Sequence, residues 1–276
     1  MIYAVIAFGY QLTFATSKTL NFGQGESLAL GALVGLSVSA VVGYWAMLPV
    51  VLLFGMAQGF MVERLAVRPA LRTRSEFGWV MATIALGIIG KNIAETIWGT
   101  DDLKFPSPLS ESPIVFAGGL RIMPMEILVL AGALAMMIAI EVFNKRTLWG
   151  KAVVATADDR DAAGLMGINS SSVITFSYGL SSAIAAFAGV LIAPLTLTGA
   201  SMGAVLALKA FAVAIIGGLN SGLGVIVGGV LLGVIEQFTA FYVSTGYKDV
   251  PGLVLLLLVL AIKPTGLFGK AVIRKV

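Results

Sequence analysis

The sequence lacks cysteine and histidine altogether, and it is poor in charged residues. Only 12% of its 276 residues are Asp, Glu, Lys or Arg, whereas soluble domains carry about 25%. Without cysteine the chain forms no disulfide and has no thiolate. Without histidine it lacks the commonest metal ligand and the usual imidazole base. By contrast, 58% of the residues are hydrophobic and the mean hydropathy is +0.99. Lipid is therefore the expected solvent for most of the chain.

The sequence also lacks a nucleotide-binding phosphate loop of the form G-x-x-x-x-G-K-[ST]. The nearest string, Gly266 to Ala271, has neither the spacing nor the hydroxyl group. Adjacent carboxylates occur only at Asp101–Asp102 and Asp158–Asp159, and both pairs fall in predicted loops. We therefore predict that the chain is not an enzyme and binds no cofactor or metal itself. Any energy that it uses is expected from a partner or an ion gradient.

Apolar runs recur along the chain at close to the 20 or so residues that a spanning helix needs. We predict an all-α, polytopic membrane helix bundle of about eight spans, some broken or re-entrant, in a single domain covering residues 1–276. The first two runs cover residues 2–17 and a stretch that ends near residue 42, and Tyr44–Trp45 is expected to form an interfacial turn after them. The next runs cover residues 47–62, 79–98, 124–143 and 173–193. Three further apolar pieces cover residues 207–217, 223–243 and 251–262.

Basic residues are distributed unevenly between the two sides of this bundle. Alternating the spans places thirteen of the eighteen Lys and Arg residues on one side. These are Lys18, the four arginines between residues 64 and 74, four cations between residues 145 and 160, and the four cations that follow residue 262. Such an excess marks the cytoplasmic side. We therefore expect the 144–172 segment and the C-terminus in the cytoplasm, and the acidic, proline-containing 99–122 loop outside.

The longest polar interruption, residues 144–169, has the pattern of two short helices. Gly150 is expected to open the first, Asp158 or Asp159 to cap the second, and Gly167 to end it in the left-handed conformation. Helices this short are marginal alone in water. They must rest either on their own membrane domain or in a groove on another protein, and the spacing alone leaves both interpretations open. The candidate contact residues are Gly150, Lys151, Ala155, Asp158, Asp159, Ala162, Ala163, Leu165 and Gly167.

Two stretches, residues 20–25 and 219–224, share the pattern Leu-Asn-x-Gly-x-Gly, and each precedes a glycine-rich run. Non-helical backbone at membrane depth is tolerated only beside protein or a water-filled cavity. Matching interruptions in two halves of a chain indicate a transport site, although a chance match in so Leu- and Gly-rich a sequence stays open. The candidate translocation-path residues are Asn21, Gln24, Glu26, Gly217, Gly218 and Asn220.

Charged residues inside the spans need an explanation, because each costs about 2.5–3.5 kcal/mol at a helix centre on insertion scales. Glu26 suits the positive end of a helix dipole. Lys91 and Glu95 stand one turn apart and can pair, while Lys209 can extend its amine toward the interface. Glu236 lies deep in its run and has no such explanation.

Glycines in the late spans have a simpler interpretation than ligand contact. Small residues let helices approach closely in lipid, where packing drives helix association. We expect this packing role at Gly217, Gly218, Gly228, Gly229 and Gly233.

The order and spacing of these motifs resemble the permease family of branched-chain amino-acid ABC importers. Residues 21–26 (NFGQGE) match a segment typical of one subunit type. Residues 150–169 match the family's G-x-A-x-x-A-x-x-x-D-x-x-A-x-x-x-x-G-I-N segment, except that Val154 stands where the family usually has arginine. Further matches lie at residues 30–32, 209–211, 217–218 and 233–236, so the resemblance covers essentially the whole chain.

The resemblance implies half of a translocation path in a bacterial or archaeal cytoplasmic membrane. Expected partners are a second permease subunit, two cytoplasmic ATPases that bind ATP and Mg, an extracytoplasmic solute-binding protein and membrane lipid, with no nucleic acid. Segment 144–172 would seat in a cleft on the ATPase.

The alternatives are an ion-coupled secondary transporter or channel for a small polar solute, with Glu26 and Glu236 as ion sites, or a membrane scaffold. The cargo, whether leucine-like amino acid, urea, amide or aromatic acid, stays open.

Overall fold

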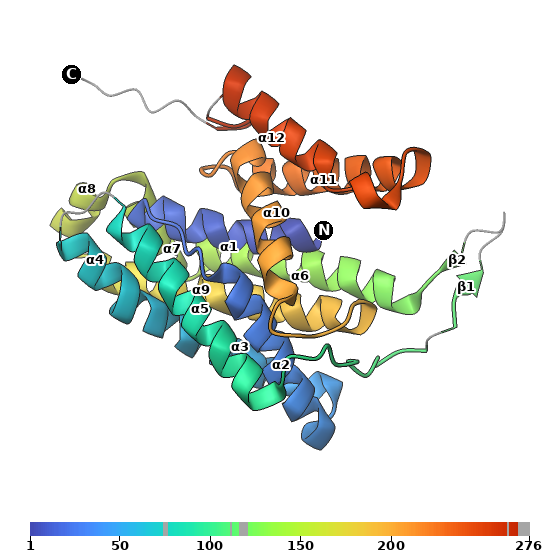
Figure 1. Ribbon diagram of the computed structural model, residues 1–276. Helices are drawn as coiled ribbons and strands as arrows, with labels where there is room; N and C mark the ends of the chain where they lie inside the picture. The colour runs from blue at the N-terminus through green and yellow to red at the C-terminus, as the bar shows by residue number, and fades with distance from the viewer. Residues whose placement is uncertain (74–76, 111, 116–120, 264, 270–276) are drawn as a thin grey trace.

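The computed structural model describes residues 1–73, 77–110, 112–115, 121–263 and 265–269 (Figure 1). Arg74, Glu111, Lys270, Arg274 and Lys275, which enter the charge arguments, lie outside the described residues. The helices of the first half are α1 Ile2–Ser17, α2 Gln24–Val42, α3 Tyr44–Val62, the π-helical η1 Glu63–Val67, α4 Arg68–Arg72 and α5 Gly78–Trp98. A two-stranded antiparallel hairpin, β1 Ile114–Val115 and β2 Arg121–Ile122, follows.

The second half begins with α6 Pro124–Arg146 and two short helices, α7 Leu148–Asp158 and α8 Arg160–Leu165. The remaining elements are α9 Ser170–Ile192, the 3-10 turn η2 Ala193–Leu195, α10 Met202–Gly217, α11 Gly222–Tyr242, the 3-10 turn η3 Thr245–Tyr247 and α12 Val250–Ile262. Among the described residues, seven helical segments are long and apolar enough to cross a membrane, and α1 and α10 are shorter apolar helices. The chain is thus a multi-pass helix bundle, as the sequence predicted.

One predicted boundary is wrong. Tyr44 and Trp45 do not form the turn between the second and third helices, because both lie in the first turn of α3. The break falls at Gly43, which has a φ of +81° and serves as both the C-cap of α2 and the N-cap of α3. Only glycine adopts that conformation without strain, so the single Gly43 determines where the helix direction changes.

Helix α9 forms the centre of the bundle and is the most buried of the long helices. It packs against α1, α2 and α3, and glycines set how closely they approach. A Cβ added at Gly59 of α3 would lie 2.2 Å from the Tyr178 carbonyl oxygen, and one at Gly31 of α2 would lie 2.4 Å from Ala186 Cα. Gly233 differs, because a Cβ there would meet no atom of the described residues within 4 Å, so Gly233 makes no close helix contact within the described part of this chain.

The polar segments predicted to share one side of the membrane lie at the same end of the bundle. In Figure 1, α4, α7 and α8 gather at the left, while the β1–β2 hairpin projects from the opposite side. Arg68 at the start of α4 also bonds to Thr175 in the second turn of α9. The 64–73 and 144–169 segments therefore occupy one end, and the hairpin of the 99–122 loop lies at the other.

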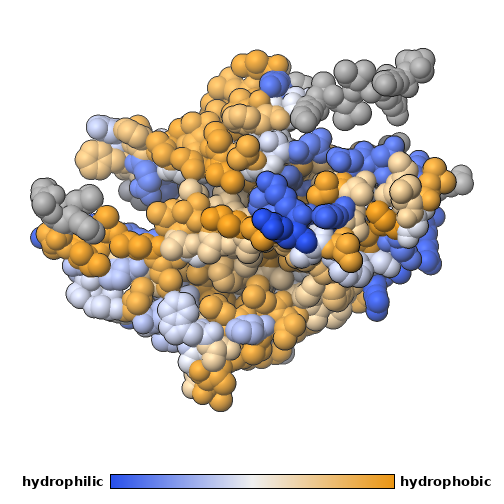
Figure 2. Space-filling model, turned by 180° about the vertical axis from the view of Figure 1, so that it is seen from behind, coloured by the Kyte–Doolittle hydropathy of each residue, from blue (hydrophilic) through white to orange (hydrophobic). Residues whose placement is uncertain are grey.

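The outer surface is mainly apolar, as a lipid-facing bundle requires. Figure 2 shows one face of the molecule, on which apolar residues cover most of the area and polar residues gather on the side that carries α7 and α8. Helices α5, α6 and α12 contribute many of the exposed large apolar side chains, and they are the least buried of the long apolar segments.

Candidate coupling segment and polar sites of the bundle

The polar segment between α6 and α9 forms two short helices, as predicted, but the first begins earlier than expected. Thr147 is the N-cap of α7, and its Oγ1 accepts a hydrogen bond from the Gly150 N–H at 2.9 Å while donating to the Phe143 carbonyl at 2.8 Å. Gly150 therefore does not open the helix. Its role is close packing, since a Cβ there would lie 2.2 Å from the Phe143 carbonyl oxygen.

Helix α8 has a complete set of terminal caps. Asp159, the second of the two predicted candidates, accepts hydrogen bonds through Oδ1 from the N–H groups of Asp161 and Ala162, both at 2.9 Å. At the other end Gly167 has a φ of +84°, and its N–H donates to the Gly164 carbonyl at 3.0 Å. The Ile168 N–H donates to the Ala163 carbonyl at 3.0 Å, which completes a Schellman motif.

The coupling segment, defined here as α7 and α8, has one face on the bundle and one free face. Val153 and Ala163 are buried, and the Trp149 ring lies 5.2 Å from the Phe176 ring of α9. In contrast, Leu165 and Met166 at the end of α8 are 90% and 83% exposed. Of the other candidate residues, Lys151, Asp158 and Ala162 are exposed and Ala155 is half-buried.

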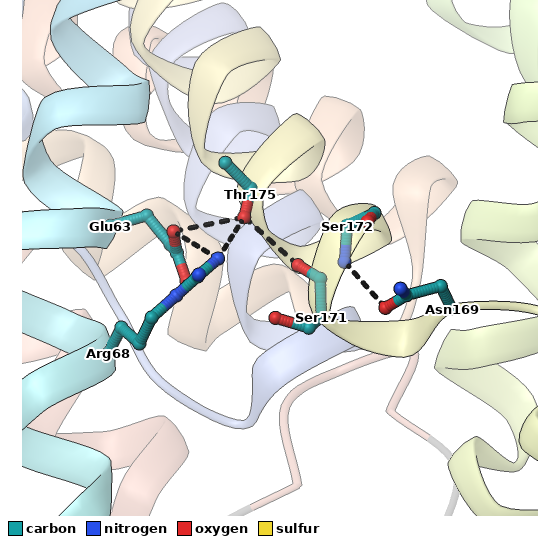
Figure 3. A network of polar contacts seen from close by, with 6 residues as sticks. All are labelled: Glu63, Arg68, Asn169, Ser171, Ser172 and Thr175. Carbon is teal, nitrogen blue, oxygen red and sulfur yellow. Dashed lines mark hydrogen bonds and ion pairs between the residues drawn. The ribbon is translucent and has the colours of Figure 1, made fainter.

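A polar network beside the coupling segment joins the end of α3 to the start of α9 (Figure 3). The Arg68 guanidinium donates from Nε and Nη2 to the two carboxylate oxygens of Glu63 at 2.9 and 3.1 Å, and Nη2 also reaches Thr175 Oγ1 at 2.8 Å. Thr175 Oγ1 lies 2.9 Å from Glu63 Oε2. Glu63 is buried, so its charge requires these partners. At the start of α9, the N-cap residue Asn169 accepts a hydrogen bond through Oδ1 from the Ser172 N–H.

Sequence reasoning missed this network because its geometry depends on a π-helical turn. Residues five apart do not face each other on an α-helix, but η1 is a π-helix in which the Arg68 N–H bonds to the Glu63 carbonyl. The wider turn brings positions 63 and 68 onto one side. Such π turns are rare and often mark functional sites.

Glu63→Ala is expected to loosen the contact between α3 and α9 more than Thr175→Val does. Alanine at position 63 removes a buried carboxylate with two partners and leaves the partly exposed Arg68 without its counter-ion, whereas valine keeps the Glu63–Arg68 pair. We expect the free energy of unfolding to fall by about 2 kcal/mol for Glu63→Ala and by about 1 kcal/mol for Thr175→Val. Unfolding of the purified chain in detergent measures both, and equal effects would contradict the assignment.

Asn21 and Gln24 lie in a second network, which is buried among α1, α2 and α9. Gln24 Nε2 donates to the Ser181 carbonyl at 3.0 Å, and Ser181 Oγ lies 3.2 Å from Gln24 Oε1 and 2.8 Å from the Gly9 carbonyl. Asn21 Oδ1 accepts from the Gly23 N–H at 3.0 Å, and its amide lies 3.4 Å from Gln24 Oε1. Protein groups therefore satisfy both amides, and their place on a path stays a prediction.

The second repeat stretch has a different environment. Asn220 is exposed, so the argument from a buried amide is wrong for this residue. A Cβ at Gly217 would lie 2.3 Å from the Gly224 carbonyl oxygen, and one at Gly218 would lie 2.7 Å from the Gly269 backbone nitrogen. Gly217 and Gly218 thus serve close backbone packing, and the two stretches are not equivalent in burial.

An ion pair explains how Glu236 can lie deep in an apolar run. The Lys209 amine lies 2.9 Å from Glu236 Oε1 and 2.6 Å from Asp249 Oδ1. The Tyr3 hydroxyl donates to Glu236 Oε2 at 3.0 Å. We expected Lys209 to extend toward the interface, but it instead joins α10 to α11 and to the loop before α12. Tyr3 of α1 completes this cluster. Lys91 and Glu95 pair as predicted, at 3.5 Å.

Glu26 is placed differently from these paired acids. It stands in the first turn of α2, and its carboxyl group is so close to α5 that a Cβ at Gly87 would lie 3.1 Å from Glu26 Cδ and Oε2. Glu26 also lines a cavity of about 320 Å³ between α2, α3 and α5. Of the six predicted path residues, Glu26 alone lines one of the cavities found among the described residues.

Comparison with known proteins now decides the family. Residues 1–262 match the family model described as "Branched-chain amino acid transport system / permease component". The chain belongs to this family. The permease protein LivH of the high-affinity branched-chain amino acid transport system of Escherichia coli K12 is 30% identical, over 99% of this chain and 93% of LivH.

Two further members show how broad the similarity is. The corresponding permease protein BraD of Pseudomonas aeruginosa is 31% identical, over 99% of this chain and 94% of its own length. LivM, a permease protein of the same E. coli system as LivH, is 26% identical, over 97% of this chain and 68% of LivM. No solved structure matches the chain. Family membership and the helix bundle together identify a membrane transport component, as the sequence analysis predicted.

Proposed function

We propose that this permease is one of the membrane subunits of an ATP-driven importer for branched-chain or related amino acids. The observation that carries the proposal is the coupling segment. Two capped helices between α6 and α9 leave Leu165 and Met166 almost fully exposed at the end that also carries the basic 64–73 segment. Exposed leucine and methionine side chains in a short, rigid helix suit an apolar groove on another protein.

The expected occupant of that end is a cytoplasmic ATPase that binds ATP and Mg, because the chain itself has no phosphate loop. Motion of the ATPase would reach the bundle through α7, which contacts α1, α6 and α9. The neighbouring Glu63–Arg68–Thr175 network would carry it on to α3. The ATPase would thereby act on the central helix α9 and on the helices around it.

A second permease subunit, two ATPases and an extracytoplasmic solute-binding protein would complete the importer. Support for the second permease comes from the likeness of this chain to both LivH and LivM, two permease proteins of one E. coli transport system. The proposed location is the cytoplasmic membrane, with the C-terminus inside. The solute-binding protein would make most of the choice among leucine-like cargoes.

Reconstitution tests the proposed function against the ion-coupled alternative. Proteoliposomes that contain the full complex are expected to take up leucine only when ATP is on the ATPase side and the binding protein is on the other side. A complex whose ATPase does not hydrolyse ATP serves as the control. Leucine uptake by this chain alone, driven by a proton or sodium gradient, would instead show a secondary transporter.

Ser110→Cys tests the orientation. Ser110 is exposed in the loop between α5 and α6, and the chain has no other cysteine. We expect an impermeant maleimide to label this variant in intact cells, because the excess of basic residues places the loop outside. Leu165→Cys on α8, in cells that express this chain without the ATPase, is the matched control and should be labelled only after lysis. The reverse labelling pattern would invert the topology.

A further inference from the structure

The cavity between α2, α3 and α5 combines an apolar wall with two polar groups. Its volume of about 320 Å³ falls within the range of roughly 300–1,000 Å³ typical of small-molecule sites. Leu30, Phe54, Met61 and Ile93 are among the apolar residues that line it, and Glu26 and Gln58 also face it. The cavity thus has room for an aliphatic side chain and acceptors for a donor group.

Glu26 differs from Glu95 and Glu236, two other acidic residues that lie within apolar helices. Glu95 pairs with Lys91, and Glu236 pairs with Lys209. Among the described residues, no cation lies within 4 Å of the Glu26 carboxylate. Lys91 acts on Glu26 through space, but its amine already pairs with Glu95 at 3.5 Å. A carboxylate without a cation at membrane depth is costly and by default marks function.

Gln58 supplies a second, independent observation. Its Oε1 atom is fully buried and has no hydrogen-bond partner in the described structure, although an orphaned buried acceptor is unfavourable. Gln58 and Glu26 line the same cavity from α3 and α2. Gln58 Oε1 therefore lacks a hydrogen-bond donor, and the Glu26 carboxylate lacks a close positive charge. An ammonium group has three donors and no acceptor.

We propose that this cavity binds amino-acid cargo in transit, with the α-ammonium on the Glu26 carboxylate and the branched side chain against the apolar wall. The inference rests on the proposed import function and assigns a station for the cargo within it. Gly87 is part of the station, because a Cβ there would lie 3.1 Å from the Glu26 carboxyl group, which would have to shift by a few tenths of an ångström. A lone carboxylate also allows release, since the cargo retains only one charged contact.

Cysteine protection tests the station in the reconstituted complex. Met61→Cys places a single thiol of this chain in the cavity wall, where a small water-soluble methanethiosulfonate is expected to label it. Leucine and 3-methylbutylamine, which carry the ammonium group, should slow the labelling. 4-Methylpentanoate, which has the same branched chain without the ammonium, should not. Equal protection by all three compounds, or by none, would overturn the proposal.

Glu26→Gln in the Met61→Cys background removes the charge and keeps the shape. The leucine concentration that gives half-protection is expected to rise about tenfold or more, as for the loss of a charge-assisted hydrogen bond, while labelling without leucine is unchanged. Unchanged protection would overturn the proposal. Uptake driven by a proton gradient that is lost in Glu26→Gln, with leucine protection intact, would also overturn it and would make Glu26 an ion site.

A glycine pair tests the same point if Glu26→Gln alters the labelling rate in the absence of leucine. Gly87→Ala should weaken leucine protection, because the added Cβ lies 3.1 Å from the Glu26 carboxyl group. Gly233→Ala on α11, which does not line this cavity, adds a Cβ that meets no atom of the described residues within 4 Å and should retain protection. Equal results for the two variants would reject the station. ATP-driven leucine uptake by the unsubstituted complex tests the import function separately.

Discussion

Replacing Leu165 with aspartate is expected to prevent assembly with the ATPase and to abolish amino-acid uptake. Leu165 is the most exposed large apolar residue of the coupling segment, at 90%, and it lies directly before the turn that Gly167 closes. An apolar anchor at the centre of an interface contributes about 2 kcal/mol or more, so the dissociation constant should rise by roughly 30-fold or more. Co-purification with the ATPase and uptake in proteoliposomes measure the two effects.

Two matched variants show whether the effect arises at the interface. Leu165→Met keeps an apolar side chain of similar volume and should assemble normally. Ala163→Arg places a charge on the buried side of α8, where Ala163 is 4% exposed, and should lower the stability of the chain as well as assembly. Leu165→Asp should leave membrane insertion and the melting temperature unchanged. Normal uptake by Leu165→Asp would show that this face does not bind the ATPase.

Replacing Gln24 with leucine is expected to lower the stability of the bundle strongly. The change leaves the Ser181 carbonyl and the Asn21 amide without the partner that they have in the structure, and both are buried. Each orphaned group costs about 1–3 kcal/mol, so we expect the free energy of unfolding to fall by about 3 kcal/mol. Unfolding of the purified chain in detergent gives this value directly.

Asn220→Leu is the matched control in the other repeat stretch. Asn220 is exposed, so the same substitution there should leave the free energy of unfolding within about 0.5 kcal/mol of its original value. Uptake by the assembled complexes then tests the path prediction for each amide. A transport defect in Asn220→Leu with unchanged stability would support a path role, whereas equal loss of stability in both variants would contradict the difference in burial.

The polar contacts divide the bundle into a part that is held firmly and a part that is open. The network around Gln24 joins α1, α2 and α9, and the cluster around Lys209 joins α10 and α11 to the loop before α12. Helix α5, in contrast, is among the least buried spans and borders the cavity that contains Glu26. Motion of α5 relative to α2 would therefore change access to that carboxylate with little disruption of the central helices.

The helix ends of α8 could be predicted from the sequence because they depend on neighbouring residues. Asp159 caps α8, and Gly167 ends it, because these residue types satisfy helix ends with groups only two or three residues away. The start of α7 was misplaced because Thr147, rather than Gly150, supplies the cap. That cap is also local, because Thr147 Oγ1 accepts from the Gly150 N–H three residues further on, and it was overlooked in the sequence.

The sequence by itself determined the solvent, the spans and the family, because apolar runs, the basic excess and spaced motifs are local properties of the chain. Only the tertiary structure decided which polar groups are satisfied. Asn21 and Asn220 occupy the same place in a shared pattern, yet Asn21 is buried and bonds to Gln24, whereas Asn220 is exposed. Glu236 and Glu26 are both acids in apolar runs, but Lys209 approaches Glu236 from a neighbouring helix and no described cation reaches Glu26. Burial and pairing depend on helices distant in sequence, and one-dimensional spacing does not contain those distances.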